Sequence, residues 1–416
     1  MKKTLTDIDV RGKKVLVRVD YNVPFDANFK ITNDKRIMET LPTIEYLLKK
    51  NASIILMSHL GRPKGKVVSE MSLKPIAIRL GKILGKSIKF VSENCVSVES
   101  KKVAKNLKPG QIFLLENLRF HPGEESKNDS GEKNKSSMDT FAKDLASMGE
   151  VFIQDAFGAV HRSHASTTGI VKYVKDAATG FLVKKELKFL RKILENPVRP
   201  FLAILGGAKV SDKISIIKNL LEKVDSIIIG GAMAYTFLKA QDVNTGASLV
   251  ENDKLDLALD IFKKTKERKV NFLLPVDHVI TNKIDFIKKN VTSDATIENT
   301  IDEAIRDGFM GVDIGVKSIE KFAEIIKSAK TIVWNGPLGI FEIDEFSKGT
   351  VEIAKVVADV TDKGVISVIG GGDSITAAKK ARIDKKISHI STGGGAFLEF
   401  LEGKDLPGIT VLPDKK

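Results

Sequence analysis

Short runs rich in Val, Ile, Leu and Phe recur along the chain and alternate with longer segments that carry Lys, Glu and Leu. Because these runs are apolar rather than alternating, they predict strands buried on both faces, and the segments between them, such as 42–49 and 216–222, have the period and length of helices. The pattern predicts a parallel α/β sheet twice over. The runs lie at residues 15–19, 54–57, 112–115, 151–153, 201–205, 227–229, 272–274, 332–334 and 365–369.

The chain has 416 residues, more than a single core usually supports, so we expect two domains. The boundary is expected near Gly180, where a helix over 182–194 follows and would act as a rigid spacer. Residues 124–137 are polar, punctuated by glycine and without period, which predicts an exposed loop. The last residues, from 406 onward, carry two prolines and fit either a loose tail or a strap that returns to the first domain.

Composition narrows the classes of function. The net charge is +14, but the lysines are spread through amphipathic segments and no basic patch interleaves with aromatic residues. We therefore expect no nucleic-acid partner and attribute the charge to attraction of anionic substrates. The single cysteine, Cys95, excludes an internal disulfide and fits a reducing cytosol. The start is not a signal peptide and no apolar run reaches the ~20 residues of a membrane span, so we expect a soluble, cytoplasmic protein.

Polar side chains follow the predicted strands of the first half. In parallel α/β sheets ligands bind beyond the carboxyl ends of the strands. Taken singly, each residue has an ordinary structural explanation. Asp20 and Asn22 are good turn formers, His59 is typical of a hydrogen-bonded structural histidine, and an isolated arginine is typical of a surface ion pair. Four strand ends with the same kind of group instead indicate a site for a small carboxylate or phosphate, which a guanidinium binds with two parallel hydrogen bonds. The residues are Asp20, Asn22, Ser58, His59, Arg62, Glu116, Asn117, Arg119, Asp155, His161 and Arg162.

Paired or tripled glycines occur only after residue 200 and follow predicted strands. Bare glycine backbone lets N–H groups approach a phosphate, and a helix that begins there adds the positive end of its dipole, so a nucleotide site is expected. Lys209 and Lys213 are expected on one face of the first such helix. Asp373 has two open interpretations, an N-cap for its helix and a carboxylate for Mg²⁺ on a nucleotide. The clusters are 206–207, 230–231, 370–372 and 393–395.

Better-known phosphate motifs are absent from the sequence. Gly81, Gly85, Lys86 and Ser87 resemble a Walker A loop, but three residues separate the glycines where four are required. The segment fits the end of a helix, so we discard this motif. No dinucleotide fingerprint, kinase catalytic loop, nucleophile elbow or set of zinc ligands occurs either.

Taken together, the motifs resemble those of the phosphoglycerate kinase family, over nearly the whole chain. RVDYNVP, SHLGRP, LLENLRFHPGEE, DAFGAVHRSHAS, ILGGAKVSDKI, WNGPLGIFE, GGGDS and STGGGA occur in the family's order. The resemblance implies a glycolytic, Mg²⁺-dependent phosphotransferase with a carboxyl group as acceptor. It would pass a phosphoryl group reversibly from 1,3-bisphosphoglycerate to ADP, giving 3-phosphoglycerate and ATP. The implied fold is two doubly wound, Rossmann-like domains of parallel sheet, joined by a hinge and a long interdomain helix, in a monomer.

The resemblance also implies a division of roles. Residues 1–180 would bind phosphoglycerate, residues 181–402 would bind the nucleotide, and a strap over 403–416 would return to the first domain. The substrate residues would be Asp20, Asn22, Arg36, His59, Arg62, Arg119 and Arg162. Position alone suggests only surface charge for Arg36, but the resemblance points it at the transferred phosphoryl group. The catalytic set would be Arg36, Lys213, Gly394 and Gly395.

The implied nucleotide site is larger. It would consist of Lys209, Lys213, Gly230, Gly231, Leu249, Gly311, Asn335, Glu342, Gly371, Gly372, Asp373 and Ser374. In the resemblance Glu342 would bind the ribose, Gly230, Gly231 and Leu249 would contact the adenine, and Asp373 would be the Mg²⁺ ligand. Three features depart from the family: Val316 replaces a usual proline, Phe397 replaces a small residue, and the polar loop after Glu125 is longer.

Two rival functions stay open at the level of the sequence. One is another carboxylate (acyl-phosphate) kinase with a different acid as acceptor, and the other is a non-catalytic polyanion-binding protein, which the charge of +14 suggests. Transfer to a carboxylate oxygen needs no general base, because that nucleophile is already ionised, and this fits the lack of a catalytic dyad. Water would hydrolyse the acyl phosphate, so we expect the hinge to close in the ternary complex.

Overall fold

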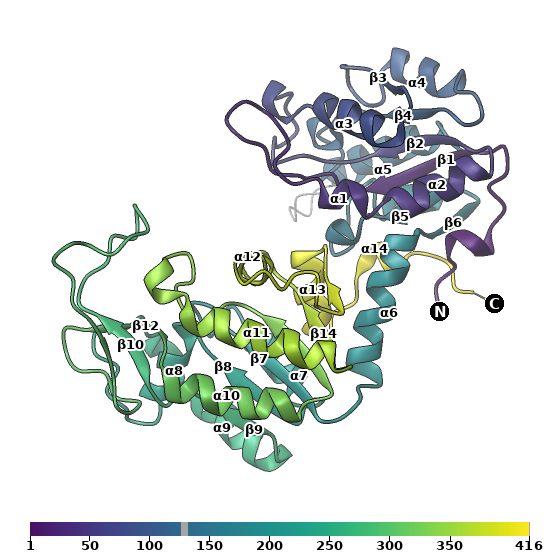
Figure 1. Ribbon diagram of the computed structural model, residues 1–416. Coiled ribbons are helices and arrows are strands. Elements are labelled where there is room, and N and C mark those ends of the chain that lie inside the picture. Colours follow the sequence, from purple (N-terminus) through teal and green to yellow (C-terminus); the bar gives the residue numbers. More distant parts are fainter. Residues whose placement is uncertain (126–131, 416) are drawn as a thin grey trace. The chain divides into compact units, whose positions relative to one another are not determined.

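The computed structural model describes residues 1–125 and 132–415, and the chain forms two compact units (Figure 1). Unit 1 contains Met1–Lys188 and Asp405–Lys416, and unit 2 contains Phe189–Lys404. Helix α6 (Phe181–Glu195), which the sequence predicts over 182–194, begins in unit 1 and ends in unit 2. Its first residue packs edge-on against Tyr46 with ring centroids 5.3 Å apart, so the start of the helix belongs to the core of unit 1.

Unit 1 is built on six parallel strands in the order β3-β4-β2-β1-β5-β6. Four of these strands follow the predicted apolar runs. The two edge strands, β3 and β6, were not predicted, because IKF and DAAT are short and mixed in polarity. The strands are β1 (Lys14–Val19), β2 (Ser53–Met57), β3 (Ile88–Phe90), β4 (Ile112–Leu114), β5 (Val151–Asp155) and β6 (Asp176–Thr179).

Apolar side chains cover both faces of this sheet. Val15, Val17 and Val19 of β1 pack into one buried cluster, whereas Leu16 packs with Phe152 into a second cluster on the opposite face. This alternation is the two-residue period of a strand, and it requires helices on both sides. Those helices are α1 (Lys35–Met38), α2 (Leu41–Lys49), α3 (Lys74–Leu84), α4 (Val98–Lys105) and α5 (Glu132–Ala146), with α14 (Pro407–Thr410) near the end of the chain.

Unit 2 repeats the architecture with six parallel strands in the order β15-β14-β13-β7-β8-β9. The predicted fold class, two α/β units with parallel sheets, is confirmed. The strands are β7 (Phe201–Leu205), β8 (Ser226–Ile229), β9 (Asn271–Leu273), β13 (Thr331–Asn335), β14 (Ile366–Ile369) and β15 (His389–Ile390). The helices are α7 (Ile214–Leu220), α8 (Met233–Lys239), α9 (Leu255–Arg268), α10 (Val316–Ser328), α11 (Lys348–Asp362), α12 (Gly372–Lys380) and α13 (Gly394–Leu401).

Unit 2 also contains a small antiparallel sheet that was not predicted. Its order is β11-β10-β12, formed by β10 (His278–Thr281), β11 (Ile297–Asn299) and β12 (Met310–Ile314) (Figure 1). These strands are short, and β11 is exposed or half-buried throughout, so the sequence has no apolar run there. Over the ranges 1–125 and 132–415, no helix is both long and apolar enough to cross a membrane.

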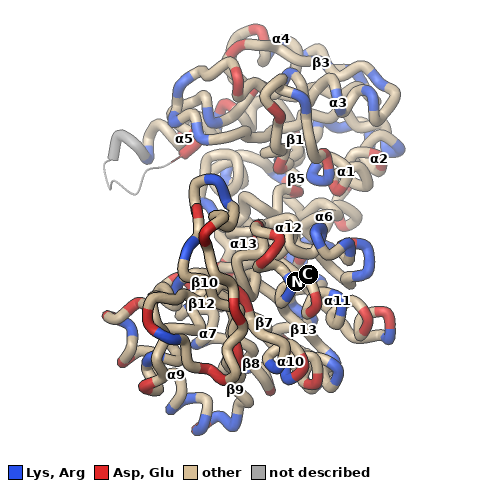
Figure 2. Tube along the Cα trace, turned by 60° about the vertical axis from the view of Figure 1, so that its left-hand side comes forward, with Lys and Arg blue, Asp and Glu red and all other residues tan. Residues whose placement is uncertain are grey.

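The end of the chain packs on unit 1. The N–H of Gly408 donates to the carbonyl of Val160 at 2.8 Å, and the N–H of Lys3 donates to the carbonyl of Pro413 at 3.0 Å. The last residues therefore lie beside the first ones. Basic and acidic residues are interspersed along the chain trace of each unit (Figure 2).

The predicted exposed loop over 124–137 is wrong at both ends, and residues 126–131 lie outside the described part of the chain. Glu124 is completely buried, and α5 already begins at Glu132. The helix was missed because its first turns are polar, as the exposed Lys135 shows. The burial of Glu124 was missed because its partners are distant in sequence, so the neighbouring residues carry no sign of them.

Asp155 at the end of β5 has a structural role. Its Oδ1 accepts the N–H of Val183 at 3.2 Å, in the first turn of α6, while its Oδ2 is buried without a partner. A Cβ on Gly180 would lie 2.3 Å from the carboxyl carbon, so only glycine lets the chain pass here. Burial raises the pKa of Asp155 to about 7. This strand-end carboxyl therefore anchors α6 and is no ligand candidate.

The raised pKa of Asp155 predicts a pH-dependent stability. The folded chain holds a proton that the unfolded chain, with its ordinary value of 3.8, releases, so the stabilisation is complete below that value and is lost as pH rises through about 7. From pH 5 to pH 8 we expect the wild type to lose about 3 kcal/mol of unfolding free energy relative to Asp155→Asn. Urea unfolding followed by circular dichroism measures it. A difference that is constant across this range would contradict the assignment.

Candidate functional site

The first candidate site lies at the carboxyl ends of β1 and β2 in unit 1. Arg36 donates through Nη1 to Oδ1 of Asp20 at 2.9 Å and to the carbonyl of Asn22 at 3.1 Å. The side chain of Asn22 accepts the N–H of Gly61 at 3.0 Å. Asp20 is buried and holds the guanidinium of Arg36, so it orients a cation rather than presenting a free carboxylate. The structure thus brings Asp20, Asn22 and Arg36 together.

His59 follows β2 and lies among cations. Burial lowers its pKa well below the ordinary value, and the positive charges of Arg18, Arg119 and Arg36 lower it further. The imidazole is therefore neutral at physiological pH. Sequence reasoning missed Arg18, although its signal was present: a charged residue inside a strand that is buried on both faces.

Two strand-end residues, Glu116 and Asn117, hold the loop that carries Arg62. Asn117 donates through Nδ2 to the carbonyl of Leu60 at 2.8 Å, and Glu116 accepts the hydroxyl of Ser72 at 2.7 Å. Both side chains are buried. They are polar because they satisfy loop backbone and hydroxyl groups, and they are not available to a ligand.

The other arginines differ in how many protein groups bind their guanidinium. Arg119 donates through Nη1 to the carbonyl of Gly61 at 2.8 Å. Arg62 and Arg162 are exposed and have no acidic partner among residues 1–125 and 132–415. Burial and the nearby charges of Arg162 and Arg119 lower the pKa of His161 to about 4. Arg162 therefore lies close enough to His161 to act on it, as Arg119 does. No described contact joins Arg62 to these residues.

The second candidate site lies at the carboxyl ends of β7, β13 and β14 in unit 2. The ammonium of Lys213 donates to Oδ1 of Asn335, whose Nδ2 donates to the carbonyl of Gly370 at 2.6 Å. Burial lowers the pKa of Lys213, while nearby carboxylates, among them Asp373, act in the opposite direction. The structure therefore brings Lys213, Asn335, Gly370 and Asp373 together from distant segments.

The prediction that Lys209 and Lys213 share one helix face is wrong. Helix α7 begins at Ile214, so Lys213 occupies its N-cap and Lys209 lies exposed in the preceding loop. Before that loop, the carbonyl of Gly207 accepts the N–H of Met233, at the start of α8, at 3.0 Å. The two ammonium groups are positioned by a loop and a helix start.

The glycine clusters serve two purposes. A Cβ on Gly206 would lie 1.9 Å from the carbonyl oxygen of Pro337, so this glycine is needed for two loops to cross. A Cβ on Gly372 or Gly394 would meet nothing within 4 Å. These two glycines begin α12 and α13, where open backbone N–H groups and the helix dipole favour an anion. Gly395 follows in the first turn of α13 and is exposed.

Asp373 is not an N-cap, because Gly371 occupies that position and no side chain caps α12. The carboxylate of Asp373 is exposed in the first turn instead. Mg²⁺ on a nucleotide typically uses one or two carboxylates together with phosphate oxygens and water, so one free carboxylate fits that ion. Within the described ranges no group of three or more potential metal ligands occurs. Ser374 is buried and accepts the N–H of Gly336 at 2.6 Å, which leaves its hydroxyl engaged.

The residues expected around the adenine, together with Gly311 of the implied nucleotide site, fall into two small groups. Leu338 covers Gly230 and accepts the N–H of Gly231 at 2.9 Å. Gly311 in β12 donates its N–H to the hydroxyl of Ser248, beside Leu249, at 2.9 Å. Leu249 is 53% exposed, so its side chain is accessible to a ligand or to water. Glu342 is also exposed, and no described contact ties it to either group.

Two of the three departures from the family, Val316 and Phe397, lie in different environments. Val316 starts α10 and is about half exposed, so it contributes little packing. Phe397 in α13 is fully buried, and its ring lies where a Cβ on Gly370 would come within 2.3 Å of it. The ring therefore fixes α13 against the glycine loop that follows β14.

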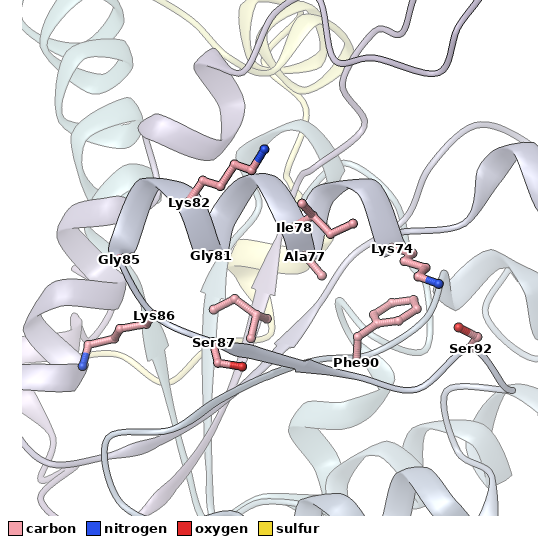
Figure 3. A pocket seen from close by; sticks show the side chains of 11 residues that line it. Lys74, Ala77, Ile78, Gly81, Lys82, Gly85, Lys86, Ser87, Phe90 and Ser92 are labelled. Carbon is pink, nitrogen blue, oxygen red and sulfur yellow. The ribbon is translucent and has the colours of Figure 1, made fainter.

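A surface cavity of about 670 Å³ lies away from these groups, beneath α3 (Figure 3). It is lined in part by Gly81, Gly85, Lys86 and Ser87, the segment that resembles a Walker A loop. Helix α3 ends at Leu84, and Gly85 has a left-handed backbone with φ of 60°. The expectation that this segment is a helix end is confirmed, and none of the candidate site residues lines the cavity.

The chain is similar to known proteins in both sequence and fold. A family model described as "Phosphoglycerate kinase" matches residues 5–404. Curated relatives of that name include one from Chlorobium phaeobacteroides (strain BS1), 52% identical over 413 residues, with 99% of this chain and 100% of the relative covered. Another, from Clostridium botulinum (strain Hall / ATCC 3502 / NCTC 13319 / Type A), is 51% identical over 415 residues, covering 100% of this chain and 99% of the relative.

Solved structures give the same result. A phosphoglycerate kinase from Coxiella burnetii aligns with a TM-score of 0.85 and 39% identity, covering 99% of this chain and 98% of the other. One from Pyrococcus horikoshii OT3 aligns with a TM-score of 0.79 and 31% identity, with the same coverage of both chains. Fold and sequence therefore agree over almost the whole length.

Proposed function

The chain belongs to the phosphoglycerate kinase family, phosphotransferases with a carboxyl group as acceptor, and we propose how its two strand-end sites divide that reaction. The family's activity is phosphoryl transfer between an acyl phosphate, 1,3-bisphosphoglycerate, and ADP. The two rivals, another carboxylate kinase and a polyanion-binding protein, are not favoured, because the named relatives match over their full length.

In this proposal the strand ends of unit 1 bind phosphoglycerate. The observation that carries it is Arg36, held by Asp20 and Asn22 beside a neutral His59 and further cations. Arg62 and Arg162 are free of acidic partners over the described ranges, so their charge is available to a doubly anionic substrate. Arg119, already held by Gly61, would complete the anion pocket.

The strand ends of unit 2 would bind the nucleotide. Lys209, Lys213 and the backbone at Gly371 and Gly372 would contact the phosphates, with Ser374 holding the loop. Gly230, Gly231, Leu249 and Gly311 would form the adenine pocket, and Glu342 would reach the ribose. Asp373 would hold Mg²⁺, which when bound neutralises charge on the nucleotide phosphates.

The chemistry asked of the protein is alignment and charge compensation. The acceptor carboxylate is ionised at neutral pH, so no general base is needed. Asp20 aims the guanidinium of Arg36, and Asn335 aims the ammonium of Lys213. With the N–H groups of Gly394 and Gly395, these cations would stabilise the charge on the phosphoryl group during transfer.

The proposal extends to the protein's location, oligomeric state and partners. The protein would act as a cytoplasmic monomer on small-molecule substrates, without nucleic-acid or membrane partners. One cysteine, Cys95, buried and free, supports a reducing compartment.

Arg36→Ala tests the assignment of the catalytic cation. Loss of one group that stabilises developing charge is expected to lower kcat about 10²- to 10³-fold, by analogy with loss of an oxyanion-hole donor. A coupled assay with 3-phosphoglycerate, ATP and Mg²⁺ measures it. Arg79→Ala is the matched control, since Arg79 is a partly exposed arginine of unit 1 paired with Asp34, and it should change nothing. Turnover of Arg36→Ala close to wild type would refute the role.

Transfer also needs two bound anions within bonding distance and shielded from water, so we propose that the units close when both substrates are present. X-ray scattering should show a smaller radius of gyration with 3-phosphoglycerate and a non-reacting ATP analogue together than with either alone. An unchanged radius in the ternary mixture would rule closure out.

A further inference from the structure

Arg18 and Glu124 form a buried ion pair behind the proposed phosphoglycerate site. Arg18 is the last but one residue of β1 and, by the alternation of a strand, lies on the same face as Leu16. Both charged side chains have zero exposure, and Nη2 of Arg18 is 3.9 Å from Oε1 of Glu124. Burying a charge costs free energy unless the charge is paired and hydrogen-bonded, so both side chains need hydrogen-bond partners inside the protein.

Ser166 is hydrogen-bonded to both charged side chains. Its Oγ accepts from Nε of Arg18 at 2.8 Å and donates to Oε1 of Glu124 at 2.6 Å. Its N–H donates to Oε2 of Glu124 at 3.1 Å. Burial opposes ionisation of Glu124, but His164, Arg18 and Ser166 outweigh it and lower the pKa of this carboxyl. Glu124 is therefore a fixed negative charge that holds the guanidinium in one orientation.

The orientation of the Arg18 guanidinium determines which ring nitrogen of His59 carries the proton. Nη2 of Arg18 lies 3.2 Å from Nδ1 of His59. A guanidinium is always protonated and can only donate, so Nδ1 must accept and carries no proton. Asp20 is 4.0 Å from the same nitrogen, too far for a hydrogen bond. A neutral imidazole then has its single proton on Nε2, which bonds to no protein group among the residues described.

The surroundings of His59 disfavour a second proton. The groups that face it are Arg18, Arg36, Arg119, His164 and Asp20, so the cations outnumber the carboxylate. Asp20 is itself engaged by Arg36. The imidazole is thus kept neutral by its neighbours as well as by burial.

We propose that Arg18, held by Glu124 and Ser166, fixes His59 as a neutral imidazole that donates a hydrogen bond through Nε2 to the phosphoglycerate anion. Arg18 and Glu124 are then positioning residues, whereas the exposed arginines supply the charge. The donation to substrate rests on the proposed function of this site, but the state of the free imidazole does not.

Nitrogen NMR of the full chain tests that state without substrate. The chain has six histidines, and His59→Gln assigns the ring of interest in a sample labelled with ¹⁵N-histidine. Long-range ¹H–¹⁵N spectra distinguish the Nε2–H tautomer, the Nδ1–H tautomer and the imidazolium. We expect the Nε2–H pattern without titration from pH 6 to 8. An imidazolium at pH 6, or a proton on Nδ1, would overturn the proposal even if phosphoglycerate binds normally.

The double variant Arg18→Met/Glu124→Gln removes both charges at similar volume, so neither is left buried alone. Nδ1 of His59 then loses its fixed donor, so the neutral ring should populate the Nδ1–H tautomer as well, and KM for 3-phosphoglycerate should rise up to about tenfold at pH 8, the loss of one hydrogen bond to a charged group, with a smaller change in kcat. The matched control is Arg79→Met/Asp34→Asn, a partly exposed pair of the same unit, which should change neither the tautomer nor KM.

The two measurements separate the inference from the proposed function. If His59 keeps its neutral Nε2–H form in the folded double variant, Arg18 does not fix it and the positioning role fails. If the ring is released but KM is unchanged, the positioning role stands and His59 is not a ligand of phosphoglycerate. Thermal unfolding of each variant establishes that the comparison is between folded proteins.

Discussion

Burial of both faces of a parallel sheet is the constraint on which each unit depends. The strands β1, β2 and β5 have no solvent-facing side, so polar side chains are confined to their ends. In a parallel sheet the carboxyl ends meet at one edge, and residues far apart in sequence become neighbours there. Asp20 and His59 come together in this way in unit 1, and Lys213, Asn335 and Asp373 in unit 2.

Arg18 is a charged exception that shows the strength of this constraint. It lies inside β1 with no exposure, and it is stable there only because Glu124 and Ser166 supply a counter-charge and hydrogen bonds. A charge held so rigidly can orient its neighbours, which an exposed lysine cannot do. In our proposal the buried pair sets the state of His59, whereas Arg62 and Arg162 are exposed.

The sequence predicted the strands that are apolar throughout, because a short, uninterrupted apolar run between helical segments is typical of a strand buried on both faces. It missed β3, β6 and the small sheet around β10, whose residues are mixed in polarity. Glycines and cations at strand ends located both candidate sites. Local pattern could not show that Glu124 is buried or that Lys213 is an N-cap, since these follow from Ser166, Arg18 and Met233, which lie elsewhere in the chain. Arg36 gained a role only through the resemblance.

The most direct test of this account is a crystal structure of the protein with 3-phosphoglycerate, ADP and Mg²⁺. We expect 3-phosphoglycerate to be hydrogen-bonded to Arg36, His59 and Arg162 at the strand ends of unit 1, and the ADP phosphates to lie at Lys213 and the start of α12. Phosphoglycerate bound elsewhere, in the cavity beneath α3 or among the glycines of unit 2, would contradict it.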